Sequence, residues 1–400
     1  MMTALISRAA RVAALIVTGL AVLILAGCND FEGMAKHLRP LSHSTKALIA
    51  KKGMSETSPI LVRLFKEESQ LEVWKQEKAT GRYALLKTYD ICKWSGKLGP
   101  KQKEGDRQAP EGFYTITPAQ LNPKSSYYLS FNMGYPNAYD RSLGRTGSHL
   151  MVHGACSSRG CYAMDDDQIQ EIYTLARLAF QGGQKSFQVH AFPFRMTPEN
   201  LAKHRRNDNY AFWKMLKEGS DVFELTRQEP KVAVCSKQYV FGTERQAGMS
   251  YSPSASCAPK VDDSVRLAVA KKRAEDELRE DKIASSLNDR DYAKIAVADL
   301  MRDPRQKNEV PPTLLALARG TMPAEAATPK APQNAPMSTP ADAPVMTASI
   351  PERSEGGKTG AETELASETP TGEGPGMATA YAPQQEEDAG LLSRLIKKVW

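Results

Sequence analysis

The chain has 400 residues, 41% of them apolar and 25% charged, which is typical of a soluble globular fold of one large or two ordinary domains. Its formal net charge of +7 suits an anionic wall or membrane surface. No stripe of Arg and Lys with interleaved aromatic residues is present, so composition argues against a nucleic-acid-binding protein.

Residues 1–27 have the pattern of a secretion signal. Two arginines precede an apolar run, 12–25, that is short for a membrane span. The run leads into Leu-Ala-Gly before Cys28 and resembles a bacterial lipobox, which implies cleavage there and acylation of Cys28. An uncleaved anchor helix is the alternative. Both interpretations place the remaining chain outside the cytoplasm, and by the same resemblance Asn29 favours the outer membrane of a Gram-negative envelope.

Residues 28–57 are polar and basic, and we expect a tether containing one short helix. His37 and His43 lie here without acidic or cysteine partners, so they are interpreted as solvated side chains.

A catalytic or binding domain is predicted over 58–258, with short strands separated by turn residues. The predicted strands are 60–65 and 70–75 (a β-hairpin), 83–92, 109–117, 127–133, 148–153, 186–194, 231–235 and 238–241. Apolar side chains at helical spacing predict a helix over 166–180, and Thr197-Pro begins another. His190 is interpreted as a core histidine. The expected fold is α+β, mostly β, with a mainly antiparallel sheet and peripheral helices.

Three segments follow this domain. Residues 259–308 are charged and alanine-rich, which predicts a partly solvated helical arm. Residues 309–388 contain few large apolar side chains and are expected to be disordered. Residues 389–400 form a short basic amphipathic segment that suits docking on a membrane or a partner.

Residues 147–164 carry the candidate chemistry. An apolar stretch ends at His153-Gly154, and a second glycine-bearing turn presents Cys161. Imidazole can take the thiol proton, while N–H groups at the Gly160-Cys161 turn can face an oxyanion. This arrangement predicts a reduced thiol of low pKa.

Two alternatives use the same residues. His149, His153, Cys156 and Cys161 are four potential zinc ligands, but histidines four apart on one strand are about 13 Å from each other. A Cys156–Cys161 disulfide is the other alternative. If Cys28 is acylated and Cys161 free, the other four cysteines allow three pairings, of which Cys235–Cys257 is the simplest local one.

The motifs resemble a known family. Ser-x-Gly-Cys downstream of His-Gly is similar to the signature of the YkuD-type L,D-transpeptidase domain. More narrowly, the chain resembles the YafK-like branch of this family in the runs 135–141, 144–148, 160–164 and 188–197. The resemblance covers roughly residues 55–245. Arg159 stands where the wider family has a second histidine, and Ala163 replaces an arginine; both fit the YafK-like branch.

The resemblance implies a role for each position. Cys161 is the expected nucleophile, His153 its general base oriented by the backbone near Gly154, and the Gly160 and Cys161 N–H groups the oxyanion hole. The candidate substrate-binding residues are Arg159, Arg145, His149, Tyr139 and Ser158. No metal or other cofactor is expected.

The implied reaction is acyl transfer on peptidoglycan stem peptides at diaminopimelate, through a thioester that passes to an amine. Passage to water would instead make a peptidase that releases a wall-bound lipoprotein. A second alternative is an inactive lipoprotein that binds wall peptides. The expected partners are stem peptides, a wall-attached lipoprotein and the membrane that holds acylated Cys28.

Overall fold

The computed structural model describes residues 34–242, 263–302, 308 and 310–321, all in the first of two units into which the chain divides, 1–331 and 332–400. No helix among the described residues is both long and apolar enough to cross a membrane. The predicted leader, the lipidation site Cys28 and the segment 389–400 lie outside the described residues.

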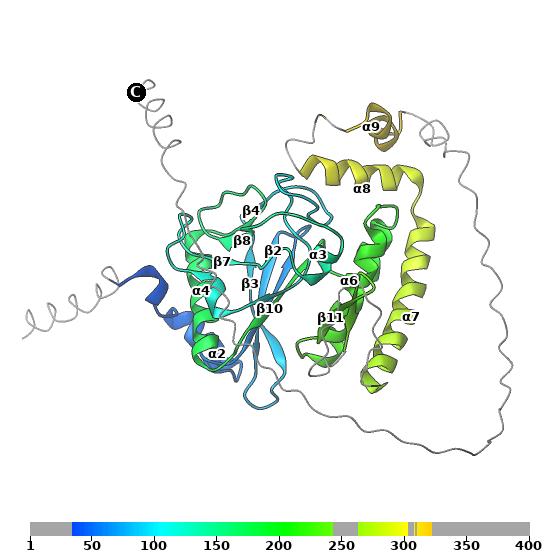
Figure 1. Cartoon of the computed structure of the whole chain (residues 1–400). Helices are drawn as coiled ribbons and strands as arrows, with labels where there is room; N and C mark the ends of the chain where they lie inside the picture. Colours follow the sequence, from blue (N-terminus) through cyan, green and yellow to red (C-terminus); the bar gives the residue numbers. More distant parts are fainter. Residues whose placement is uncertain (1–33, 243–262, 303–307, 309, 322–400) are drawn as a thin grey trace, which may run out of the picture. The chain divides into compact units, whose positions relative to one another are not determined.

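A first five-stranded sheet carries the core of the domain (Figure 1). Its order is β3-β2-β1-β10-β5, and β1 and β10 are its parallel pair. The strands are β1 Ile60–Phe65, β2 Gln70–Gln76, β3 Tyr83–Asp90, β5 Gly112–Ile116 and β10 Phe187–Phe192. The predicted hairpin over 60–75 is confirmed, since β1 and β2 pair antiparallel.

A second five-stranded sheet carries the candidate site. Its order is β4-β9-β8-β7-β6, with β8 and β9 parallel and the other pairs antiparallel. The strands are β4 Lys93–Trp94, β6 Leu121–Asn122, β7 Ser130–Asn132, β8 Met151–His153 and β9 Tyr162–Ala163. A separate hairpin joins β11 Val232–Cys235 and β12 Gln238–Phe241. The mainly antiparallel prediction is confirmed.

Helices complete the domain. They are α2 His43–Lys51, α3 Ala138–Ser142, α4 Asp166–Gln181, α5 Pro198–Lys203 and α6 Tyr210–Thr226, with 3-10 turns η1 Lys36–Leu38 and η2 Pro118–Gln120. Side chains of β1 alternate between two clusters: Val62 packs in the cluster that contains the apolar face of α4, and Leu61 packs with Phe223 of α6. The first sheet therefore lies between α4 and α6.

Several predicted strands are shorter than expected, and in two of them a residue near the predicted start has a positive φ. The strand over 148–153 begins at Met151, because His149 adopts a φ of 55°, outside the extended region. The strand over 127–133 begins at Ser130, and Tyr128 has a φ of 68°. His190 is fully buried, as predicted, and burial places its pKa well below the usual range.

The arm after the domain contains α7 Asp263–Ser286, α8 Asp289–Arg302 and α9 Pro312–Arg319. One face of α7 packs on α5 and α6 through ion pairs such as Lys217–Asp276 at 2.6 Å, while the other exposes Leu267 and Leu278. The boundary of the expected disordered segment, residue 309, is too early in the chain. Residues 312–319 form α9, and its leucines pack on Ala293 and Val297 of α8.

Candidate active site

His153 is the last residue of β8, and a glycine turn follows it. The Gly154 N–H donates to the carbonyl of Tyr127 at 3.0 Å and to that of Leu129 at 3.2 Å. A Cβ on Gly154 would meet Asp166 Oδ1 at 2.5 Å, so a larger residue at 154 would force the Asp166 carboxylate to move. The turn therefore holds the histidine backbone tightly between β7 and α4.

The His153 ring has one nitrogen engaged and one open. Its Nδ1 lies 2.6 Å from the Gly154 carbonyl, which can only accept, so Nδ1 carries the hydrogen in the neutral ring. Nε2 then presents its lone pair and has no hydrogen-bond partner in the described part of the chain. Burial lowers the pKa of His153, which is 3% exposed, so the neutral, basic form prevails at neutral pH.

Cys161 lies immediately before β9. The parallel register pairs Val152 with Tyr162, which places Cys161 beside Met151. The Met151 N–H donates to the Cys161 sulfur at 3.4 Å, and the sulfur lies 3.9 Å from the His149 carbonyl oxygen. Side chains at 151, 153 and 161 share one face of the two strands, so the thiol and the imidazole point to the same side.

The Cys161 thiol is not acidified. Burial raises its pKa, and the Met151 N–H and the nearby ammonium of Lys101 offset this only in part. The expectation of a low-pKa thiol is therefore wrong, because a thiolate here would be poorly solvated. The thiol and the imidazole are therefore both neutral at rest, which suits proton transfer during attack rather than a resting ion pair.

A disulfide anchors the loop between the two residues. Cys156 is bonded to Cys92, which adjoins β4, while Cys161 is free. The alternative Cys156–Cys161 disulfide is thus wrong, and Cys156 cannot serve as a thiolate zinc ligand while this bond is intact. Cys235 is also disulfide-bonded, but Cys257 lies outside the described residues.

Ser158 braces the cysteine turn. Its hydroxyl donates to the Cys161 carbonyl at 2.7 Å and accepts from the Gly160 N–H at 3.3 Å. One of the two predicted oxyanion donors is therefore engaged within the turn. The Cys161 N–H has no hydrogen-bond partner among the described residues and is the open donor beside the sulfur.

Two predicted substrate-binding residues are buried in the protein instead. Arg145 Nη1 pairs with Asp140 at 2.8 Å, and its guanidinium lies over the rings of Tyr139 and Phe212. Tyr139 is itself buried and stacks on Tyr239, with ring centroids 4.4 Å apart. Because the charge and the ring are both satisfied inside the fold, neither is available to bind a substrate carboxylate or cap a cleft.

Arg159 and His149 are exposed near the thiol. Arg159 has no ion pair or hydrogen bond of its side chain in the described part of the chain. His149 Nδ1 lies 2.9 Å from the Ser148 hydroxyl. Their predicted contact with substrate stays a prediction, and their exposure is compatible with it.

The sequence did not connect the loop over 95–109 with the cysteine. Ser95 Oγ lies 3.3 Å from Ser158 Oγ and donates to the Arg107 carbonyl at 2.9 Å. Lys101 in this loop is buried and contributes positive potential at Cys161. The loop was recognisable as Lys- and Gly-rich, but Ser95 and Ser158 are 63 positions apart, so their contact left no local pattern.

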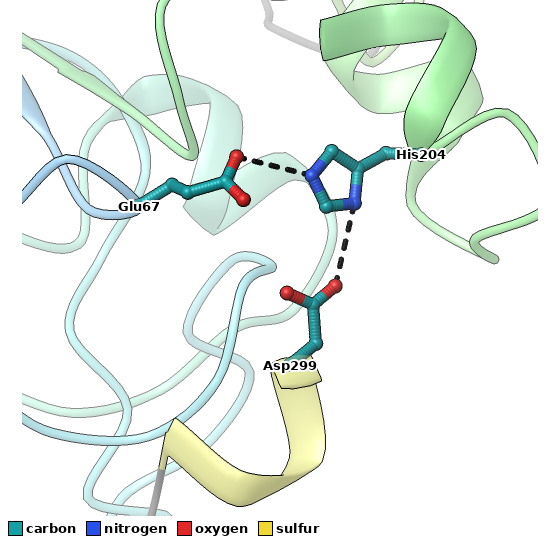
Figure 2. Close-up of side chains that lie close together, drawn as sticks. All are labelled: Glu67, His204 and Asp299. Carbon is teal, nitrogen blue, oxygen red and sulfur yellow. Dashed lines mark hydrogen bonds and ion pairs between the residues drawn. The ribbon is translucent and has the colours of Figure 1, made fainter. Parts of the chain in front are cut away.

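A second constellation, Glu67, His204 and Asp299, was also missed (Figure 2). His204 Nε2 lies 3.1 Å from Glu67, and its Nδ1 lies 3.3 Å from Asp299 on α8. Burial opposes the charged ring, but the two carboxylates outweigh it and raise the pKa of His204 to about 9. Arg302 pairs with both carboxylates as well.

Within the described residues, Glu67, His204 and Asp299 form a group of side chains close enough together to hold a metal ion. Their arrangement fits a proton better, because each ring nitrogen points to a different carboxylate and both N–H groups are needed. The imidazolium and Arg302 already balance the negative charge. We therefore interpret the group as an ionic clamp between α8, the β1–β2 turn and the end of α5.

The domain that carries this site has matches among known proteins. Residues 61–222 match YkuD, the L,D-transpeptidase catalytic domain. The chain is 44% identical over 218 residues to "Putative L,D-transpeptidase YafK" of Escherichia coli, in strains K12 and O157:H7, covering 54% of this chain and 87% of each relative.

Two solved structures are similar at low identity. The helical cell shape determining protein Pgp2 (K307A mutant) of Campylobacter jejuni is 18% identical, with a TM-score of 0.28 over 50% of this chain and 81% of that one. Bd1075 of Bdellovibrio bacteriovorus is 16% identical, with a TM-score of 0.25 over 44% and 77%. The identity to the YafK proteins is what places the sequence: the chain belongs to the YkuD family of L,D-transpeptidase domains, in its YafK-like branch.

Proposed function

We propose that this protein is a cysteine-dependent L,D-transpeptidase that acts on peptidoglycan stem peptides at diaminopimelate. The observation that carries the proposal is the free Cys161 thiol on the same strand face as His153, whose Nε2 is open. Family membership supplies the substrate class, and this pair supplies the chemistry.

In the first half-reaction, His153 Nε2 takes the thiol proton as the Cys161 sulfur attacks the carbonyl carbon at the L-centre of diaminopimelate. The Cys161 N–H faces the developing oxyanion. The carbon–nitrogen bond then breaks, and the imidazolium returns its proton to the departing amine. The product is a thioester on Cys161 and a neutral imidazole.

In the second half-reaction, an acceptor amine attacks the thioester and gives a proton to His153. The carbon–sulfur bond breaks, and the sulfur regains its proton from the imidazolium. Water in place of the amine hydrolyses the thioester, which is the peptidase outcome that releases a wall-bound lipoprotein. Exclusion of water from the acceptor side decides between them.

The binding-only alternative requires a silent thiol. A free, half-buried Cys161 on the same strand face as His153, whose Nε2 is open, supports the enzyme instead. The test is incubation of wild type and Cys161→Ala with diaminopimelate-containing muropeptides, followed by mass analysis. Cross-linked dimers with wild type alone establish transfer, shortened stems establish hydrolysis, and identical products for both proteins overturn the proposal.

We also propose that acylated Cys28 anchors the protein to the outer membrane, on its periplasmic face. The lipobox-like run before Cys28 supports this assignment. Expression with an alkyne fatty acid should label wild type and not Cys28→Ser. Unlabelled wild type in a membrane-free periplasmic fraction would contradict the anchor.

A further inference from the structure

Tyr127 lies against the imidazole of His153. The two ring centroids are 4.7 Å apart and the rings are tilted by 38°. The same residue accepts the Gly154 N–H through its carbonyl at 3.0 Å. Tyr127 therefore contacts both the ring of the proposed base and the turn that orients it, while the residue as a whole is 48% exposed.

The proposed chemistry forms a cation in a buried place. When His153 takes the thiol proton, it becomes an imidazolium, which burial disfavours. The Gly154 carbonyl at Nδ1 is the polar group that stabilises this cation. Lys101, in the loop over 95–109, supplies positive potential at Cys161, which favours the thiolate and not the imidazolium.

A nearby carboxylate is committed elsewhere. Asp166 of α4 accepts the Ala155 N–H through Oδ1 at 2.8 Å, so it holds the turn after His153. No charged side chain contributes to the lowered pKa of His153 within the described chain. Among the described residues, the base therefore has no acidic third member of the kind that orients the histidine of many catalytic triads.

We propose that Tyr127 is the positioning residue of this site, and that its π face stabilises the His153 imidazolium during acyl transfer. This inference rests on the proposed function of the His153–Cys161 pair. A cation within about 6 Å of an aromatic centroid is attracted by the ring quadrupole, and the contact also restricts rotation of the imidazole.

The adjacent tyrosine provides a matched control. Tyr128 points to other partners: its hydroxyl donates to Gln170 of α4 at 3.0 Å and accepts from Arg39 at 3.2 Å. Substitutions at 128 therefore perturb the same segment without changing the ring that faces His153.

The experiment compares Tyr127→Leu and Tyr127→Phe in the full chain. Leucine keeps an apolar cover but removes the π face, whereas phenylalanine keeps both. The pKa of His153 is read from its proton resonances, assigned with His153→Gln, and Cys161 acylation by a carbapenem is timed by intact mass. Tyr127→Leu should lower the pKa of His153 by about half a unit and slow acylation about two- to fivefold. Tyr127→Phe and Tyr128→Leu should match wild type.

Wild-type values for the leucine variant, in both the titration and the acylation rate, would overturn the inference. Equal losses in the leucine and phenylalanine variants would overturn it as well, because the π face would then be irrelevant. Tyr127→Met gives a second non-aromatic side chain should the leucine variant fail to fold. The titration needs no turnover, so wild type that processes no muropeptide would contradict the proposed function while the titration still decides the role of Tyr127.

Discussion

The Met151 N–H donates to the Cys161 sulfur at 3.4 Å, and Met151 lies two residues before His153 on β8. The parallel pairing of β8 with β9 thus sets the thiol against the strand that carries its proposed base. A short sheet, rather than a flexible loop, fixes the relation between nucleophile and base, which is the condition for efficient proton transfer.

Replacement of His153, the proposed base, should slow the acylation of Cys161. His153→Gln removes the open nitrogen while keeping a polar side chain, so acylation of Cys161 by a carbapenem should fall about 10²- to 10⁴-fold. His43→Gln, on the exposed face of α2, is the matched control and should acylate at the wild-type rate. A His153 variant within threefold of wild type would show that another group takes the proton.

The pH dependence should reveal a neutral pair. Burial lowers the pKa of His153 and raises that of Cys161, so the base stays deprotonated to a pH below 6.5 and the thiol stays protonated to a pH above 9. The acylation rate should therefore begin to fall only below pH 6.5, while alkylation of Cys161 by iodoacetamide should be slow at neutral pH and rise in alkali. Rapid alkylation at pH 5 would reveal a resting thiolate and contradict this description.

The Cys92–Cys156 disulfide should stabilise both the fold and the site. It joins residues 64 apart in sequence and anchors the loop between His153 and Cys161. Cys92→Ser/Cys156→Ser should lose about 2–4 kcal/mol of unfolding free energy and acylate more slowly, since the loop gains freedom. Calorimetry and intact-mass kinetics measure the two effects. Unchanged values in both would show that the bond does not support the site.

The His204 clamp should make attachment of the arm depend on pH. The folded-state pKa is raised from 6.5 to about 9, so its stabilisation is complete below pH 6.5 and is lost as the pH rises through 9. In urea, wild type should lose on the order of 1–3 kcal/mol of unfolding free energy between pH 6 and 9.5 that His204→Gln does not lose. Parallel pH profiles for the two proteins would contradict the clamp.

Local patterns in the sequence predicted much of the fold. Alternating apolar residues predicted the β1–β2 hairpin, and helical spacing with acids in the first turn predicted α4 to within one residue at its C-terminal end. His153 and Cys161 were identifiable because each adjoins a glycine turn within one short stretch. Such features are encoded by residues close together in the chain.

Long-range contacts account for what the sequence did not predict. The sequence made Arg145 a candidate to bind a substrate carboxylate, but in the fold its guanidinium pairs with Asp140 and lies over two aromatic rings. The Cys92 partner was one of several pairings that spacing alone cannot rank. The His204 clamp brings together residues 67, 204 and 299. Tyr127 contacts His153 from the segment that precedes β7. Neither contact leaves a local signal in the sequence.

The central claim is that the Cys161 sulfur accepts an acyl group from a stem peptide. Wild type incubated with a diaminopimelate-containing tetrapeptide muropeptide, without added acceptor, and quenched in acid can be digested and mapped by mass spectrometry. We expect an acyl mass increment on the peptide that contains Cys161, removed by neutral hydroxylamine and absent from Cys161→Ala. Turnover of the muropeptide by the Cys161→Ala protein at the wild-type rate would contradict it.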